Sequence, residues 1–280
     1  MKTVVFYLSW LPYGKDYFVR FLDNYLKCPA GHSHKLIVLF NGISLISEDE
    51  LKEFQQILIS KNLPESQFLL FENGQDIEIY QKAASIVDAD FFLFLNTYSQ
   101  FIHRDWLNCY IKNWTENTGL IGASGSYASY LSAVKVFNKW SWSDDISLSE
   151  KMKILKYKLK LNFLHRRKFK KFPAPHIRTN AFFTSKAIFT SISVDSINGK
   201  MDAYFFENGK DSLTEKVLKM GLKCIIIDKL GKSYDIPDWP TSKIFWIDNQ
   251  ENLLISDNQT SKYQGATFRE KKMYNEIAWG

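Results

Sequence analysis

Short apolar runs and amphipathic segments alternate along the first part of the chain. The clearest run is Phe91–Leu95, five apolar residues in succession, with Asp88 and Asp90 before it and the polar cluster Asn96-Thr97-Tyr98-Ser99 after it. A short unbroken run of this kind is typical of a strand buried on both faces, as at the centre of a parallel sheet. Further strands are predicted at residues 3–9, 35–40, 67–71, 120–123, 176–183 and 224–227.

Between the predicted strands, apolar residues recur three and four positions apart, as on one face of a helix. This spacing predicts helices over residues 16–27, 77–87 and 104–117. Capping boxes at residues 47–50 and 212–215 mark the starts of two more helices, and Gly221 is placed to end the second. Alternating strands and helices predict βαβ units, and therefore an α/β fold with a mainly parallel central sheet flanked by helices.

Polar side chains follow four successive strands of this predicted sheet: Ser9, Asn41, Asn73 and Asn96. Right-handed crossovers bring the carboxyl ends of parallel strands to one edge, where ligands bind. Short polar side chains at four strand ends suit a nucleotide. Neither Gly-x-Gly-x-x-Gly after the first strand nor a Gly-x-x-x-x-Gly-Lys-Ser/Thr loop occurs, which disfavours dinucleotide-dependent oxidoreductases and P-loop NTPases.

The composition predicts an ordinary folded protein, since 45% of the 280 residues are hydrophobic and 24% are charged. We expect a single domain over residues 1–280, with a basic helical insertion at about 140–172 and a carboxyl-terminal tail at about 230–280. Aromatic residues make up 16% of the chain, which is usual both in sugar-binding clefts and in phenylalanine-rich cores. The net charge of +6 favours anionic partners such as phosphates or lipid headgroups.

The predicted insertion contains a strongly basic segment. Residues 151–172 hold ten Lys or Arg and no acidic residue, and their apolar residues follow helical spacing. Such a helix can lie on an anionic membrane surface, or it can pack its apolar stripe against the main domain, and the sequence leaves both open. Nucleic-acid binding is disfavoured because no known nucleic-acid-binding module accompanies the patch.

Three widely spaced cysteines, Cys28, Cys109 and Cys224, argue against a disulfide framework and fit a reducing compartment. No cysteine or histidine spacing typical of structural zinc occurs. The apolar start of the chain is short and no small-residue cleavage site follows, so it is interpreted as the first strand rather than a signal peptide. We expect a cytoplasmic protein, held at the inner face of a membrane if the basic segment binds lipid.

Several motifs together carry a family resemblance. They are residues 41–44 and 72–74 after the second and third strands, the Phe91–Leu95 strand with its polar end, residues 176–182, and residues 207–209 before a helix. Over residues 1–221 their order and spacing resemble the GT-A glycosyltransferases, which have a Rossmann-like fold. Residues 73–77 and 206–214 are similar to rhamnan-synthesis-type and related polysaccharide glycosyltransferases of bacteria. The resemblance implies hexosyl or deoxyhexosyl transfer from a nucleotide-sugar to a glycan or lipid-linked acceptor in surface polysaccharide (O-antigen, capsule or rhamnan-like) synthesis.

One departure from the family concerns the metal. GT-A enzymes usually carry Asp-x-Asp after the fourth strand, and this chain has the neutral Asn96 and Tyr98 there, which do not supply anionic oxygens for Mg²⁺ or Mn²⁺. Asp88 and Asp90 precede the strand and belong to the opposite edge. The sequence therefore predicts that no divalent cofactor is required. Another cation must then neutralise the leaving diphosphate.

Arg178 is the first candidate for that cation, because a guanidinium forks onto phosphate oxygens. His176 is the second, as a hydrogen-bond donor or cation, and Arg269 is a candidate in the tail. The complete predicted donor-binding set is Ser9, Asn41, Asn73, Asp76, Asn96, Tyr98, Ser99, His176, Arg178 and Asn180.

An inverting transfer needs one general base. By resemblance this is Glu207, in a predicted loop before a capped helix, and Asp211 is the alternative. The sequence does not exclude a retaining enzyme. A second hypothesis is a catalytically degenerate fold that binds glycans or a partner. A third, a nucleotidyltransferase, is weaker because no glycine-rich basic loop follows the first strand.

Overall fold

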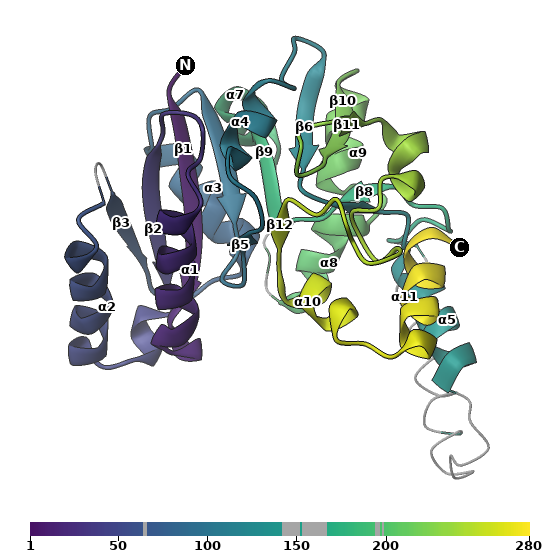
Figure 1. Cartoon of the computed structure of the whole chain (residues 1–280), viewed down its shortest axis with the longest axis horizontal. Helices are drawn as coiled ribbons and strands as arrows, with labels where there is room; N and C mark the ends of the chain where they lie inside the picture. Colours follow the sequence, from purple (N-terminus) through teal and green to yellow (C-terminus); the bar gives the residue numbers. More distant parts are fainter. Residues whose placement is uncertain (64–65, 142–151, 153–166, 194–196, 198) are drawn as a thin grey trace.

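The protein is described by a computed structural model covering residues 1–63, 66–141, 152, 167–193, 197 and 199–280. Its main feature is an eight-stranded sheet with the order β11-β10-β6-β9-β4-β1-β2-β3 (Figure 1). The parallel strands are β1 (Thr3–Trp10), β2 (Lys35–Asn41), β3 (Gln67–Phe71), β4 (Phe91–Leu95), β6 (Thr118–Gly122) and β10 (Lys223–Ile227). This arrangement confirms the predicted α/β fold with a mainly parallel central sheet.

The strand predicted at residues 176–183 differs from expectation in two ways. It divides into β8 (His176–Ile177) and β9 (Ala181–Ser185), and β9 lies inside the sheet, antiparallel to both β4 and β6. A strand that runs against its neighbours presents its amino end where theirs end. The residues just before β9 therefore reach the edge at which β4 and β6 finish.

Helices cover both faces of the sheet, and each face has its own core. One face packs against α1 (Lys15–Lys27), α2 (Glu48–Ser60) and α4 (Trp106–Ile111). The other packs against α3 (Asp76–Ile86), α7 (Lys186–Ser191), α8 (Lys200–Asn208) and α9 (Leu213–Lys219). Alternate residues of β1 serve the two cores, as expected for a strand buried on both faces.

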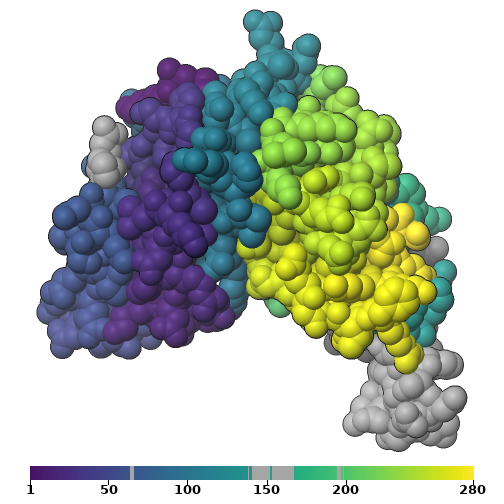
Figure 2. Space-filling model, viewed as in Figure 1, coloured from purple at the N-terminus to yellow at the C-terminus, as the bar shows by residue number. Residues whose placement is uncertain are grey.

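The carboxyl-terminal part of the chain packs beside this sheet. Helices α5 (Tyr130–Ser141), α10 (Asn258–Gln264) and α11 (Phe268–Trp279) share a third cluster built on Tyr263, Met273, Tyr274 and Ile277. Figure 2 shows the surface hollowed between the purple and blue amino-terminal part of the chain and the yellow tail. The hollow lies on the side where the parallel strands end.

Short elements complete the fold. The small sheets are β5 (Gln100–Phe101) with β12 (Ile255–Ser256), and β7 (Gly125–Ser126) with β8; β11 (Ser233–Tyr234) extends the main sheet. The 3₁₀ helices are η1 (Leu11–Tyr13), η2 (Ile43–Leu45) and η3 (Ile236–Thr241).

The predicted boundaries of three helices can be compared with those in the structure. Ser47 caps α2 in the predicted capping box, and Gly221 adopts the left-handed φ of +77° expected after α9. The helix predicted over residues 104–117 is shorter, because Asp105 has a φ of 60° and precedes α4, and Trp114 lies beyond its end. Trp114 instead packs edge-on against Phe91 and Phe183.

Most of the predicted basic helix at residues 151–172 lies outside the described residues. Residues 167–172 are described, and they form a turn and a bridge between Phe169 and Gly209 rather than a helix. The helix prediction is therefore wrong for residues 167–172. Among the residues that the structure describes, no helix has the length and apolar character to cross a membrane. All three cysteines are free thiols.

Candidate active site

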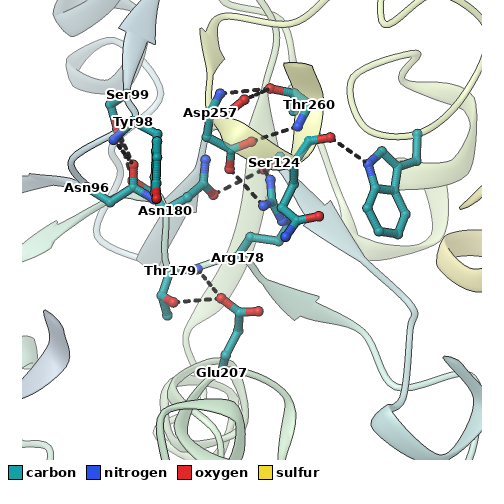
Figure 3. A network of polar contacts seen from close by, with 12 residues as sticks. Asn96, Tyr98, Ser99, Ser124, Arg178, Thr179, Asn180, Glu207, Asp257 and Thr260 are labelled. Carbon is teal, nitrogen blue, oxygen red and sulfur yellow. Dashed lines mark hydrogen bonds and ion pairs between the residues drawn. The ribbon is translucent and has the colours of Figure 1, made fainter. Parts of the chain in front are cut away.

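The polar cluster after β4 folds into a compact turn. The Oδ1 atom of Asn96 accepts hydrogen bonds from the backbone N–H of Tyr98 at 3.0 Å and from Oγ of Ser99 at 3.1 Å (Figure 3). The backbone N–H of Asn96 donates to the carbonyl of Asn180 at 3.1 Å. The structure thus joins the end of β4 to the start of β9 and brings four predicted site residues together.

The ends of the first three strands lie on the same edge but farther away. Ser9 is buried within β1, and Asn73 is exposed after β3. The Nδ2 atom of buried Asn41 donates to the Gly74 carbonyl at 2.8 Å, while its Oδ1 has no hydrogen-bond partner among the described residues. β3 is four strands from β9, so the two strand axes lie roughly 19 Å apart.

Three tyrosines gather at the end of β1. The ring of Tyr98 lies 5.6 Å from that of Tyr13 and 5.1 Å from that of Tyr17, and Tyr13 is 50% exposed. Burial raises the pKa of Tyr98, and its interaction with Tyr13 adds to that shift. Asp76 is the first residue of α3. Tyr13 and Tyr17 were not among the predicted site residues. The only signal for them was their place just after the first strand.

Arg178 is already paired in this structure. Its Nη2 donates to Oδ2 of Asp257 at 2.7 Å, its Nη1 donates to Oγ of Ser124 at 3.2 Å, and its guanidinium lies 4.2 Å from the centre of the Phe245 ring. Arg178 and Asp257 are both buried. The guanidinium is therefore charge-compensated, in contrast to the free cation expected from the sequence. Asp257, in the tail, was not predicted.

Glu207 lies in the last turn of α8, so its prediction as a loop residue was wrong. The apolar face of residues 200–208 packs Phe206 into the core, which favours a helix there. Oε2 of Glu207 accepts hydrogen bonds from the backbone N–H of Thr179 at 2.8 Å and from its hydroxyl at 2.6 Å. In the described part of the chain, no hydrogen bond reaches Oε1.

His176 is buried, and its hydrogen bond fixes its tautomer. Nδ1 lies 2.9 Å from the Ala174 carbonyl, which can only accept, so Nδ1 carries the proton and Nε2 keeps a lone pair. Burial lowers the pKa of the imidazole, and the nearby charge of Glu207 partly opposes this shift. The expected role as donor or cation therefore does not match a neutral ring whose Nε2 can only accept.

Burial of a neutral His176 predicts that stability depends on pH. Below the ordinary histidine pKa of about 6.5 the unfolded chain binds a proton here that the folded chain resists. The neutral imidazole therefore stabilises the folded state fully above about pH 6.5, and this contribution to the free energy of unfolding decreases as the pH falls below that value. In His176→Asn, whose Nδ2 can still donate to the Ala174 carbonyl, we expect a smaller fall in melting temperature between about pH 7 and pH 5 than in the wild type. Identical pH profiles of the two proteins would contradict the assignment.

Three of the predicted site residues share the wall of one pocket, which has a volume of about 520 Å³. Helix α8 contributes Glu207, while β8 and the residue after it contribute His176 and Arg178. The structure therefore brings the predicted base and the two leading candidate cations together, although they are about 30 positions apart in the sequence.

Asp211, the alternative base, does not join them. It is exposed. Its Oδ1 accepts a hydrogen bond from the Lys219 ammonium at 2.7 Å, and its Oδ2 lies 3.6 Å from the Lys216 ammonium. The hydrogen bond from Lys219, and after it the charge of Lys216, hold the pKa of Asp211 below its ordinary value. Asp211 lines a different hollow, on another side of α8. The tail cation Arg269 donates to the carbonyl of Trp140 and lies outside the pocket as well.

The end of β4 does not fit a divalent cation. Oδ1 of Asn96 already accepts two hydrogen bonds, and Oγ1 of Thr97 donates to the Leu8 carbonyl at 2.9 Å and accepts from the Trp10 N–H at 3.1 Å. Within the described ranges, no group of three His, Cys, Asp or Glu side chains is arranged to hold a metal. No anionic oxygen is offered where an Asp-x-Asp pair would stand.

The pair Asp88 and Asp90 lies at the opposite edge of the sheet, as strand polarity requires. The Lys2 ammonium donates to Asp88 at 2.6 Å, and the Lys2 backbone N–H donates to Asp90 at 2.6 Å. Both carboxylates thus bind the amino-terminal end of β1, which agrees with a structural role.

Comparison with known proteins gave matches only among solved structures; no family model and no curated protein matches the chain. The matches include the mannosyltransferase PcManGT from Pyrobaculum calidifontis, solved with GDP-Man and Mn²⁺ (11% identity, 43% of this chain and 34% of that chain, TM-score 0.36). They also include S. aureus TarS 1–349 (15% identity, 44% and 35%, TM-score 0.34) and the galactosyltransferase LgtC (11% identity, 81% and 73%, TM-score 0.46). The matched part spans about a third of the first two structures. Sequence identities and TM-scores as low as these assign neither a family nor a function to the chain.

Proposed function

We propose that the chain is a glycosyltransferase that moves a sugar from a nucleotide-sugar donor to a hydroxyl group of an acceptor. The observation that carries the proposal is the pocket whose wall contains both Glu207 and His176. Arg178, in the same wall, is two positions before Asn180, whose carbonyl accepts from the Asn96 N–H at the end of β4. A carboxylate and a neutral imidazole in one pocket are suited to take a proton from an acceptor hydroxyl. The motif order that resembles GT-A enzymes supports the same reaction.

In the proposed inverting reaction, the acceptor oxygen attacks the anomeric carbon and the bond to the nucleoside diphosphate breaks. The diphosphate leaves with the bonding electron pair, and the hydroxyl proton passes to the base. Glu207 is the proposed base, because Thr179 holds Oε2 and fixes the direction of the carboxylate. The lone pair on Nε2 of His176 can accept a hydrogen bond from the same acceptor.

The donor is proposed to lie along the strand ends, between the tyrosine cluster and β9. Two buried amide atoms there, Oδ1 of Asn41 and Nδ2 of Asn180, have no hydrogen-bond partner among the described residues. Buried polar atoms are normally paired, so these two favour a polar ligand. Because the residues after β4 do not fit a divalent cation, we propose transfer without a metal cofactor.

A titration with nucleotides tests this proposal. A ligand present at 100 times its Kd stabilises a folded protein by about 2.7 kcal/mol, so a binding nucleoside diphosphate or nucleotide-sugar should raise the melting temperature. Transfer by the best donor should persist in excess chelator. Complete loss of activity in chelator would rule out the metal-independent reaction, but it would not contradict the proposed sugar transfer.

One observation favours the second hypothesis, a degenerate fold that only binds glycans or a partner. The cation expected to neutralise the diphosphate, Arg178, is paired with Asp257. The same titration separates the hypotheses, because such a fold is expected to show no melting shift with any nucleotide.

We further propose that the reaction belongs to the synthesis of bacterial surface polysaccharide, with a glycan or lipid-linked acceptor, in the cytoplasm and at the inner face of the membrane. The support is the sequence resemblance and the basic composition of residues 151–172. Vesicle sedimentation with and without anionic lipid would test the membrane contact.

A further inference from the structure

The pocket that holds Glu207 has a second, apolar wall. Helix α5 contributes Tyr130, Val134 and Phe137 to it, and α11 contributes Ile277. The three residues of α5 are four and three positions apart, so they form one stripe along the helix. None of them is buried, and Phe137 is 55% exposed.

Val134 and Phe137 are separate from the residues that pack α5 against the rest of the fold. Val136 and Trp140 of α5 pack against the third core cluster, which α11 supplies in large part. A helix at a protein surface usually needs one apolar stripe to face the core. Within the second stripe, Tyr130 stacks on buried Phe169, with ring centres 4.9 Å apart. Val134 and Phe137 line the pocket and are not buried.

Trp246 forms part of the same pocket and has an unusual backbone. Its φ is 49°, in the left-handed region that a bulky residue rarely adopts. Its ring stacks on Phe245 at 4.5 Å and lies 4.7 Å from the ring of Tyr274. Strained residues persist where the surroundings hold them in place, and they gather at ligand sites.

The chemistry of the walls limits what the pocket can hold. An aromatic ring can stack on the apolar face of a sugar, but the hydroxyl groups at the edges of a bare oligosaccharide that lay against Val134 and Phe137 would lose water without gaining a partner, which is costly. A ligand that is polar near Glu207 and hydrocarbon along α5 leaves no such group unpaired. Mostly apolar walls with a few polar groups are typical of small-molecule sites in general.

We propose that the stripe Tyr130, Val134 and Phe137 binds an aliphatic chain attached to the acceptor sugar, whose reacting hydroxyl lies at Glu207 and His176. The placement of the sugar rests on the proposed function. The placement of the aliphatic chain rests on the lining of the pocket itself.

Calorimetric titration with alkyl glucosides, below the concentration at which they form micelles, tests the chain site. We expect decyl β-D-glucoside to bind far more tightly than methyl β-D-glucoside, by roughly a fourfold decrease in Kd for each methylene that is buried. Val134→Asn should raise the Kd of the decyl compound at least tenfold, and Phe137→Ser, which changes an exposed side chain, should act in the same direction. Ile59→Asn, on α2 and 67% exposed, is the matched control and should leave the Kd unchanged.

Equal affinity for the methyl and decyl compounds would overturn the proposal. The proposal would also be overturned if neither pocket substitution changed the Kd of decyl glucoside. It would be overturned as well if Ile59→Asn changed that Kd as much as the pocket substitutions do, because the compound would then be binding as an adventitious detergent. Phenyl β-D-glucoside binding as tightly as the decyl compound would overturn the aliphatic class. If a nucleotide raises the melting temperature but decyl glucoside does not bind, the aliphatic-chain site is refuted and the proposed transferase is not. If decyl glucoside binds, Val134→Asn weakens that binding and no nucleotide raises the melting temperature, the site is supported and the proposed transferase is refuted.

Discussion

Replacing Glu207 by Gln is expected to slow sugar transfer by about 10²- to 10⁴-fold, the usual contribution of a general base. Glutamine keeps the length of the side chain and an oxygen that can accept the hydrogen bonds from Thr179, which measure 2.8 and 2.6 Å in the wild type. It removes the charge and the basic oxygen. The turnover number with the best nucleotide-sugar is the measurement, and the melting shift produced by the nucleotide should stay unchanged.

Asp211→Asn provides the comparison, because Asp211 was the alternative base in the sequence and lies among surface lysines in the structure. We expect its turnover to equal that of the wild type. Normal turnover in Glu207→Gln together with a large loss in Asp211→Asn would reverse the assignment of the base.

Breaking the ion pair between Arg178 and Asp257 is expected to have the second large effect. Removing one partner of a buried pair leaves an uncompensated charge and costs about 3–5 kcal/mol of unfolding free energy. Both residues are buried, and Oδ2 of Asp257 is 2.7 Å from Nη2 of Arg178. The free energy of unfolding of Asp257→Asn, from denaturant titration, is the measurement.

The choice of asparagine separates the charge from the helix cap. Asp257 also caps α10, where its Oδ1 accepts from the Thr260 N–H at 2.8 Å, and asparagine is an equally good cap. In the double variant Arg178→Met with Asp257→Asn, much of the lost stability should return, since no charge is left unpaired. A loss below about 1 kcal/mol in Asp257→Asn, as for an exposed pair, would contradict the role given to this contact.

Sequence patterns predicted the sheet well because strand burial leaves a local signal. The run Phe91–Leu95 matches β4 residue for residue, and strand polarity correctly separated Asp88 and Asp90 from the polar edge. The capping box at Ser47 is likewise a contact within four residues. In each case the residues that form the structure are neighbours in the sequence or lie on adjacent strands.

The predictions failed where distant partners decide the structure. Arg178 looked free because Asp257 lies 79 positions later, and no local pattern links the two. Glu207 was assigned to a loop because Asn208 and Gly209 follow it, whereas burial of Phe206 stabilises a helix up to Asn208. The neutral state of His176 depends on its burial and on the Ala174 carbonyl, which only the folded chain reveals.

The antiparallel course of β9 has a consequence for the order in which the molecule is made. The first half of the sheet can pair by contacts between neighbouring strands, but the residues before β9 are synthesised only after β1 to β4, and Asp257 follows Arg178 by a further 79 positions. Contacts between such distant segments form slowly, because long loops must close first. A nascent chain that already buries its amino-terminal strands therefore still lacks the counterion of Arg178. The pocket is therefore complete only after the residues up to Ile277, which lines it, have been synthesised.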